Sequence, residues 1–347
     1  MEQSVILFYN NKGRKLNYLI TIEFFTRTVM LKKIAECIKN NSNIIEKRSI
    51  DPVVQFINLN SFKSSRIFSD IGEDSAAVKN DNGMYTLVTT DRIKTSFIEK
   101  FPFGAGFSSI LVGVDDIYAC GGTPLAASLI ISFKAQKIGQ KIIEGVCAGS
   151  KKFNVPIIRG HTNMKKHYEL STALIGEIKK EDYISAKNAQ PNDNIILAVD
   201  FDGKIGKASN LHWDTVTYKS SEEVLNKRKS MNIIAQEHLA NSSKDVSNGG
   251  VFGTILQLMQ YSEVGADINI EKIVIPQKLI EKEYNLETYI KMFLTTSYIL
   301  TAPEEKSQQI IKIFKDQNMS ANLIGKITKK AGLKINNGKE SIDVIEY

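Results

Sequence analysis

Acidic side chains stand where the pattern of this sequence changes, and carboxylates gathered from several such places can hold a metal ion. Glu73 and Asp74 lie in a loop with small residues behind it, and Asp91 ends the apolar segment LVTTD. Asp116 lies within a long apolar segment, and Asp245 stands just before VSNGGVFG. Mg²⁺ takes oxygen ligands from proteins and shares its remaining positions with water and phosphate. The five carboxylates therefore predict a site for magnesium and a polyphosphate.

A second group of polar residues follows a short apolar run in the segment VPIIRGHTN, residues 155–163. The run favours a buried strand, and the polar residues are predicted to lie where that strand ends: Arg159, Gly160, His161, Thr162 and Asn163. Further along, Gly249 and Gly250 open a predicted helix. Unblocked backbone N–H groups and the positive end of the helix dipole would attract an anion there. Both groups fit a phosphate ligand.

Each of these residues also has a structural interpretation. Asp and Glu in loops often form turns and caps, and Asp245 could cap the helix that follows it. A histidine after a glycine often only makes hydrogen bonds within the fold. The sequence has no G-x-x-x-x-G-K-S/T, H-E-x-x-H or G-x-S-x-G, and GAG at 104–106 lacks the third glycine of a dinucleotide motif. A phosphate site in this chain would therefore not be a P-loop.

Alternating strand and helix signals predict an α/β (α+β) protein whose elements deliver these residues. Apolar residues from Phe107 to Tyr118 recur at helical spacing, Asp116 falls nearly opposite Phe107, and Gly121 and Gly122 end the helix. Strands are predicted at 84–91, 124–133, 155–158, 169–178 and 194–201, and helices at 30–40, 106–120, 139–153, 220–239, 249–260 and 304–314.

The length of 347 residues predicts two domains. A polar, proline-containing stretch at 187–193 marks the boundary, which gives an N-terminal domain at 30–186 and a C-terminal domain at 187–347. Residues 1–29 are poorly patterned and are interpreted as an extension or a mis-called start, with Met30 as the true beginning.

The composition argues against several classes of function. The net charge of +7 comes from scattered lysines with no basic helix, so we expect no nucleic-acid partner. No apolar run approaches the roughly 20 residues of a membrane helix. Cys37, Cys120 and Cys147 lack paired spacing, which argues against a disulfide framework and a zinc site. We expect a cytoplasmic protein that binds an anionic small molecule.

Taken in order, five segments resemble the AIR synthase superfamily, which includes AIR synthase, thiamine-monophosphate kinase, selenophosphate synthetase and a hydrogenase-maturation dehydratase. GEDSAAV resembles its G-D-D-x-A-A-V loop, LVTTD its metal-binding strand end, VGVDDIYACGGTPLAASL its N-x-x-D-I-A-A-M-G-x-x-P-L segment, VPIIRGHTN its G-V-P-x-x-G-G-H-T segment and KDVSNGGVFGTI its D-x-S-x-G-G helix start. The resemblance runs from about Leu31 to about Lys326 and is nearest to AIR synthase-related proteins of the methanogenesis-marker type.

The resemblance implies an N-terminal domain whose sheet pairs in a homodimer and a C-terminal α/β domain that covers a cleft holding ATP and Mg²⁺. It implies metal or phosphate contacts for Asp74, Asp91 and Asp116, with Glu73 beside them and Asp245 facing them from the second domain. It places further residues at the nucleotide or the substrate: Arg159, Gly160, His161, Thr162, Asn163, Gly249 and Gly250.

The implied reaction is ATP- and Mg²⁺-dependent transfer of the γ-phosphoryl group to a carbonyl or phosphate oxygen of a small molecule, with His161 as a proton shuttle or phosphate contact. The chain departs from the superfamily pattern at Glu73, Gly113 and Arg159, and His161 stands where thiamine-monophosphate kinase has an aspartate. Two alternatives remain: an enzyme like thiamine-monophosphate kinase or selenophosphate synthetase, and a non-catalytic nucleotide-binding module that acts through a partner.

Overall fold

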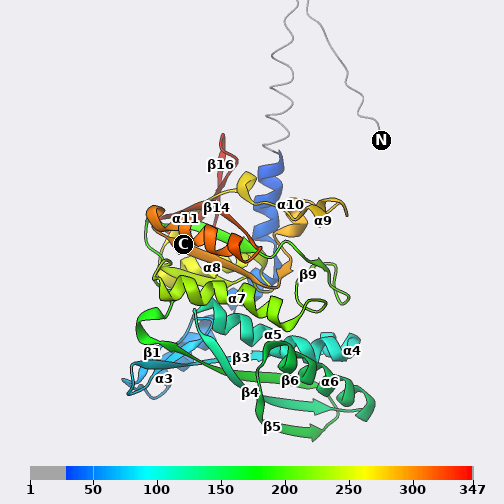
Figure 1. Cartoon of the computed structure of the whole chain (residues 1–347). Coiled ribbons are helices and arrows are strands. Elements are labelled where there is room, and N and C mark those ends of the chain that lie inside the picture. Colours follow the sequence, from blue (N-terminus) through cyan, green and yellow to red (C-terminus); the bar gives the residue numbers. More distant parts are fainter. Residues whose placement is uncertain (1–28, 50, 346–347) are drawn as a thin grey trace, which may run out of the picture.

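The computed structural model describes residues 29–49 and 51–345, which form two large β-sheets with helices packed on and between them (Figure 1). The predicted α/β class, with a sheet and helices in each half of the chain, is confirmed. The interpretation of residues 1–29 as an extension lies outside the described residues, apart from residue 29, which begins the first helix, 29–39. No helix among the described residues is long and apolar enough to cross a membrane.

The first sheet has six strands in the order β1-β2-β3-β6-β4-β5, and every pair is antiparallel except β4–β5. Alternate residues of a strand face opposite sides. The buried residues Tyr85, Leu87 and Thr89 of one strand therefore share the face that α5 covers. The strands are β1 (Ile67–Ser69), β2 (Ala76–Lys79), β3 (Met84–Arg92), β4 (Thr123–Phe133), β5 (Ile157–Met164) and β6 (Glu169–Lys179).

Three helices pack on this sheet: α4 (Thr95–Lys100), α5 (Pro102–Ala119) and α6 (Gln136–Phe153). The α5 helix forms where the apolar spacing predicts it, and its stripe from Phe107 to Tyr118 is buried. It ends at Ala119, and the chain turns away at Gly121, whose φ of +81° lies in the left-handed region that glycine tolerates. The α6 helix packs so closely on it that a Cβ at Gly145 would lie 2.0 Å from the carbonyl oxygen of Phe103. Glycine is required at that crossing.

The second sheet has seven strands in the order β10-β13-β7-β14-β11-β15-β16, and a small third sheet has the order β12-β9-β8. The strands are β7 (Asn194–Val199), β8 (Lys204–Ile205), β9 (His212–Asp214), β10 (Ser242–Asp245), β11 (Gly265–Asn269), β12 (Phe293–Leu294), β13 (Ser297–Ala302), β14 (Ser320–Thr328), β15 (Gly332–Asn336) and β16 (Ser341–Ile345). The helices of this half are α7 (Ser221–Gln236), α8 (Gly250–Ser262), α9 (Gln277–Ile280), α10 (Leu286–Tyr289) and α11 (Glu304–Asp316). As the capping-box spacing predicts, the Ser220 hydroxyl accepts a hydrogen bond from the N–H of Glu223.

One hydrophobic core joins the two halves. Figure 1 shows α5 and α7 between the two large sheets. Apolar residues of α5 and α6 form one cluster with Met231 of α7 and with Tyr298 and Leu300 of β13. The helices that precede β1 in the described chain are 29–39, α2 (Ser42–Ser49) and α3 (Asp51–Asn60).

The helix 29–39 packs into the second half of the molecule. Its residues Leu31, Ile34 and Ile38 are buried in the cluster that contains Phe252 and Ile255 of α8. The sequence places this helix in the domain 30–186, because spacing reveals an apolar stripe but not the core that receives it. The domain boundary at 186 and 187 stays a prediction.

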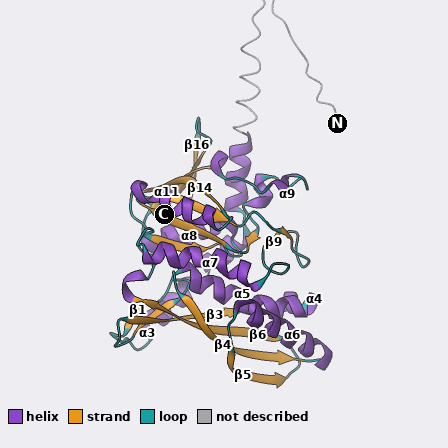
Figure 2. Cartoon of the chain, in the orientation of Figure 1, coloured by secondary structure: helices purple, strands orange, loops and turns teal. Residues whose placement is uncertain are grey.

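Strand β5 differs from its prediction. The sequence predicts that the strand stops at Ile158, but β5 continues to Met164 and contains the polar residues of the segment. The reason is its position, because Figure 2 shows β5 at the edge of the sheet with β4 as its neighbour. An edge strand needs no buried face, so polar residues can pair in register, as His161 does with Ile130.

Candidate acidic metal site

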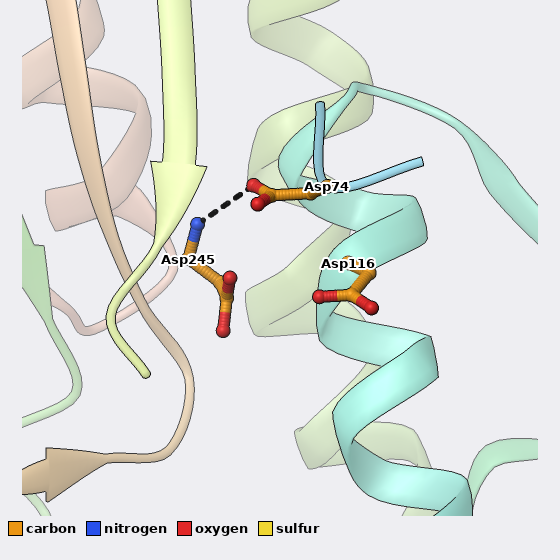
Figure 3. A group of neighbouring side chains, drawn as sticks. All are labelled: Asp74, Asp116 and Asp245. Atoms are coloured by element: carbon orange, nitrogen blue, oxygen red, sulfur yellow. Dashed lines mark hydrogen bonds between the residues drawn. The ribbon is translucent and has the colours of Figure 1, made fainter. Parts of the chain in front are cut away.

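Three carboxylates from distant parts of the chain meet between the two sheets. One oxygen each of Asp74, Asp116 and Asp245 lies within 4.8 Å of the others. Figure 3 shows the side chains of Asp74 and Asp116 pointing toward Asp245. Asp74 comes from the loop between β1 and β2, Asp116 from the last turn of helix α5, and Asp245 is the last residue of β10.

Hydrogen bonds hold the carboxylates of Asp116 and Asp74 and the backbone of Asp245. The Thr89 hydroxyl on β3 donates to Asp116 at 2.5 Å. The backbone N–H of Asp245 donates to Oδ2 of Asp74 at 3.2 Å, so the first half of the chain is tied to the second at the cluster itself. The Thr254 hydroxyl on α8 donates to the carbonyl oxygen of Asp245 at 3.1 Å. The site therefore depends on both sheets.

Asp91 lies beside this cluster on β3. It is two residues after Thr89 and so shares the sheet face that looks toward Asp116. Its directly opposite residue on β6 is Thr172, whose hydroxyl is buried and has no hydrogen-bond partner among the described residues. A buried hydroxyl without a partner is costly, and a ligand oxygen or a metal-bound water would satisfy it.

The electrostatics of the cluster favour a cation. Burial raises the pKa of Asp116 well above its usual range, and the charges of Asp91, Asp245 and Asp74 raise it further. Like charges held this closely cannot all ionise without a counter-ion. Four carboxylates supply the hard oxygen ligands that Mg²⁺ prefers, so the donor set fits this ion.

Sequence reasoning missed Lys244. Its side chain is 5% exposed and forms an ion pair with Oδ1 of Asp74, and its Nζ lies 3.4 Å from the carbonyl oxygen of Gly72. Burial disfavours its charged form, yet the nearby carboxylates of Asp74 and Asp245 raise the pKa of Lys244. The one available signal was its position next to Asp245 in the short segment SSKD, all four residues of which are buried.

Glu73 lies outside the cluster. Its Oε1 accepts hydrogen bonds from the hydroxyls of Ser69 at 2.5 Å and Ser185 at 2.6 Å, and its Oε2 accepts one from the N–H of Ala186 at 2.7 Å. The carboxylate therefore holds the segment that leads into the second half of the chain. This contact differs from the metal-binding role that the sequence predicts.

The start of α8 also differs from its prediction. The N–H of Gly250 donates to Ser247 O at 2.8 Å and the N–H of Val251 donates to Ile290 O at 3.1 Å, so these two groups are not available to an anion. Gly250 has a φ of +65°, and a Cβ there would lie 2.1 Å from the carbonyl oxygen of Ile290. Close packing on residues 290 and 291 therefore explains this glycine.

The residues of β5 do not reach the cluster within one chain. Across the sheet, Asp91 pairs with Thr172, Thr172 with Leu129, and Leu129 with Gly160. Three strand spacings of about 4.8 Å place Gly160 roughly 14 Å from Asp91. The structure thus brings Asp74, Asp91, Asp116 and Asp245 together and leaves the β5 group apart.

The five predicted site residues of β5 alternate between the two sides of the sheet. Thr162 pairs with the buried Ile131 and His161 pairs with Ile130, whose side chain is 50% exposed. Because neighbours in register point to the same side, Gly160 and Thr162 lie on the face that helices cover over β4, although both residues are themselves exposed. The other three predicted contacts lie on the open face: Arg159, His161 and Asn163.

Two family models match the chain. The N-terminal domain of AIR synthase related protein matches residues 72–178, and its C-terminal domain matches residues 200–336. An uncharacterized protein of Methanocaldococcus jannaschii is 34% identical over 319 residues, which cover 91% of this chain and 97% of that protein. The thiamine-monophosphate kinase of the same organism is 26% identical over 63% of this chain and 74% of its own length.

The fold is also similar to solved structures. The protein AaThiL, solved in complex with AMPPCP and TMP, matches with a TM-score of 0.62 and 19% identity, over 85% of this chain and 95% of its own. This similarity confirms the two-domain AIR-synthase-like fold. The superfamily resemblance inferred from the five segments is confirmed by the two family models.

Proposed function

The chain belongs to the AIR synthase-related protein family, and from that premise we propose that it is an ATP- and Mg²⁺-dependent enzyme that transfers a phosphoryl group to a small molecule. The observation that carries this proposal is the convergence of Asp74, Asp116 and Asp245 from three elements. Relatives that use ATP support it, since a thiamine-monophosphate kinase is among them and AaThiL was solved with AMPPCP.

Each carboxylate has a role in this proposal. Asp74, Asp91, Asp116 and Asp245 would hold Mg²⁺ beside the phosphates of ATP. The ion, when bound, neutralises charge on the phosphates and on the group in flight. The hydrogen bond from Thr89 keeps Asp116 oriented toward the ion. The hydroxyl of Thr172, which is buried and has no hydrogen-bond partner among the described residues, would be available to donate to a phosphate oxygen.

The reaction is a displacement at the γ-phosphorus. A carbonyl or phosphate oxygen of the acceptor forms a new P–O bond while the bond from the γ-phosphorus to the β,γ-bridging oxygen breaks. ADP leaves with the electron pair of that bond. Such a transfer needs positioning and electrostatic stabilisation more than covalent help from the protein.

The β5 residues enter the proposal through a second copy of the chain. His161 and Arg159 face away from their own cluster and lie on an exposed edge strand. We place them, with Gly160, Thr162 and Asn163, at a homodimer interface where they contact nucleotide or substrate. His161 would then act as the proton shuttle or phosphate contact, because an imidazole ring can both donate and accept a proton.

The test is ADP release from ATP in the presence of Mg²⁺, together with nucleotide binding by calorimetry. Asp116→Asn and Asp91→Asn should each lower turnover at least about 10²-fold and weaken Mg²⁺-dependent ATP binding. Asp316→Asn on α11 is the control, since its side chain is 54% exposed and makes one ion pair with Lys312. If both cluster variants bind and turn over ATP as the control does, the ligand assignment is wrong.

A second candidate is a nucleotide-binding module without catalysis. The ion pair between Lys244 and Asp74 favours it, because the lysine engages an oxygen that a metal ion would otherwise use. Tight ATP binding with no turnover on any acceptor would support this candidate. Assays with thiamine monophosphate and with selenide decide whether the reaction is like that of thiamine-monophosphate kinase or that of selenophosphate synthetase.

A further inference from the structure

We infer that Lys244 is a built-in cation of the acidic cluster, which takes the place of one divalent ion and so limits the number and affinity of the metal ions that the site binds. This inference rests on the proposed function, because it concerns the same carboxylates. Under this inference, Lys244 helps to set how many metal ions one chain binds.

The contacts of Lys244 place its charge inside the cluster. The ammonium group pairs with Oδ1 of Asp74, and Oδ2 of the same carboxylate accepts the N–H of Asp245. Both oxygens of Asp74 are therefore engaged before any metal ion arrives. An ion bound between Asp74, Asp116 and Asp245 would lie one carboxylate away from the lysine charge.

The position of Lys244 is held by the fold. Its side chain is 5% exposed and its Nζ lies 5.8 Å from the centre of the Tyr261 ring. The same ring packs on Gly72, where a Cβ would lie 2.5 Å from Cδ1 of Tyr261. The loop that carries Asp74 is thus clamped between α8 and the lysine, and the ammonium group cannot move into solvent without leaving a buried carboxylate unpaired.

The charge count gives the consequence. Asp74, Asp91, Asp116 and Asp245 carry four negative charges when ionised, and Lys244 reduces the total to three. Two divalent ions would overcompensate this total, whereas they would balance the four carboxylates alone. A divalent ion one carboxylate away from the lysine is repelled by its charge. This repulsion is strong enough to lower the affinity for the ion at least about tenfold, even with the high effective dielectric of a protein site.

The experiment measures Mn²⁺ binding to the full-length chain without nucleotide, by the electron paramagnetic resonance signal of free Mn²⁺ and by calorimetry. Lys244→Met keeps the length of the side chain and removes its charge, and it should tighten Mn²⁺ binding at least about tenfold or add a second ion per chain. Lys244→Arg keeps the charge and should stay within about threefold of the wild type. Unchanged or weaker binding by Lys244→Met would overturn the inference.

A second comparison keeps the test valid if Lys244→Met fails to fold. Asp74→Asn should weaken Mn²⁺ binding. Adding Lys244→Met to that variant should raise the Mn²⁺ affinity again by at least about tenfold, because the lysine no longer repels the ion. The double variant should also fold, because no buried carboxylate is left unpaired. No recovery would contradict the inference. A wild type that binds Mn²⁺ no better than Asp116→Asn would instead overturn the proposed metal site, and the inference with it.

Discussion

Asp116 is a residue whose proposed function works against the stability of the metal-free fold. Burial and the charges of Asp91, Asp245 and Asp74 raise its pKa, which means that its ionised form is disfavoured in the native state. We predict that Asp116→Asn raises the unfolding free energy of the metal-free protein by about 1 kcal/mol, because asparagine keeps an acceptor for Thr89 and removes the charge. Thermal unfolding in EDTA measures this.

The same variant should lose the stabilisation that Mg²⁺ gives to the wild type. Addition of Mg²⁺ raises the melting temperature of the wild type by mass action if the cluster binds it. The Asp116→Asn protein should show a much smaller rise. A lower melting temperature than the wild type in EDTA would contradict the electrostatic argument.

The resemblance to the AIR synthase superfamily, carried by five segments in order, implied that Asp74, Asp91, Asp116 and Asp245 converge, and the structure brings these four together. Two neighbours were not predictable. The segment GEDSAAV does not indicate which of its two acidic residues joins the cluster. Asp74 does, whereas Glu73 accepts hydrogen bonds from Ser185 and Ala186. Lys244 stands in a stretch where an exposed lysine is the common outcome, and only its pairing with Asp74 across 170 residues makes it part of the site.

Buried His212 should make the unfolding free energy depend on pH. Burial lowers its pKa, with Asp214 opposing the shift. A histidine with a depressed native pKa takes up a proton on unfolding, so stability is complete above the unfolded pKa of about 6.5 and falls as pH decreases below it. We expect His212→Gln to flatten this fall in urea unfolding between pH 7.5 and 5.5. His167→Gln is the control, because that side chain is 62% exposed, and an equal fall in both variants would rule His212 out.

At the scale of elements, one buried ion pair joins α5 to α7. Arg228 Nε donates to Oδ1 of Asp115 at 2.7 Å, and both side chains are buried. We predict that Asp115→Leu lowers the unfolding free energy by about 3–5 kcal/mol, because it leaves the arginine charge buried without a partner. Urea denaturation measures the loss.

The matched control for this pair is the double variant Asp115→Leu with Arg228→Met. It removes both charges and keeps similar volume, so it should recover most of the loss. A double variant as unstable as the single one would show that packing, rather than the unpaired charge, causes the effect.

Elements with a periodic apolar face were predictable, and an edge strand was not. The spacing of Phe107, Ile110, Leu111 and Val114 predicts α5 directly, because one face must be buried. Strand β5 has no such face, and its polar residues resemble a loop in the sequence. Only the register with β4 shows that His161 and Thr162 lie on opposite sides of the sheet.

At the scale of the whole molecule, the two large sheets share a core, and the first sheet keeps an open side. The helices α5 and α6 cover one face, where Ala127 and Ile131 are buried. On the other face Ile130 is 50% exposed, and β5 forms an exposed edge beside it. An exposed apolar side chain on the open sheet face, beside a free edge strand, favours association with another sheet.

We therefore predict a homodimer that forms through this open face and edge. Ile130→Lys should shift the protein toward the monomer in light scattering coupled to size exclusion, because a charge in an apolar interface is costly to desolvate. Ile280→Lys is the matched control: Ile280 is also 50% exposed but lies on α9 in the other half of the chain, so this variant should keep the wild-type mass. If the dimer carries the β5 residues to the nucleotide, Ile130→Lys should also lose ATP turnover while its Mn²⁺ binding persists, since the four aspartates come from one chain. A wild type that is monomeric at assay concentrations and still turns over ATP would refute both the dimer and the role given to His161.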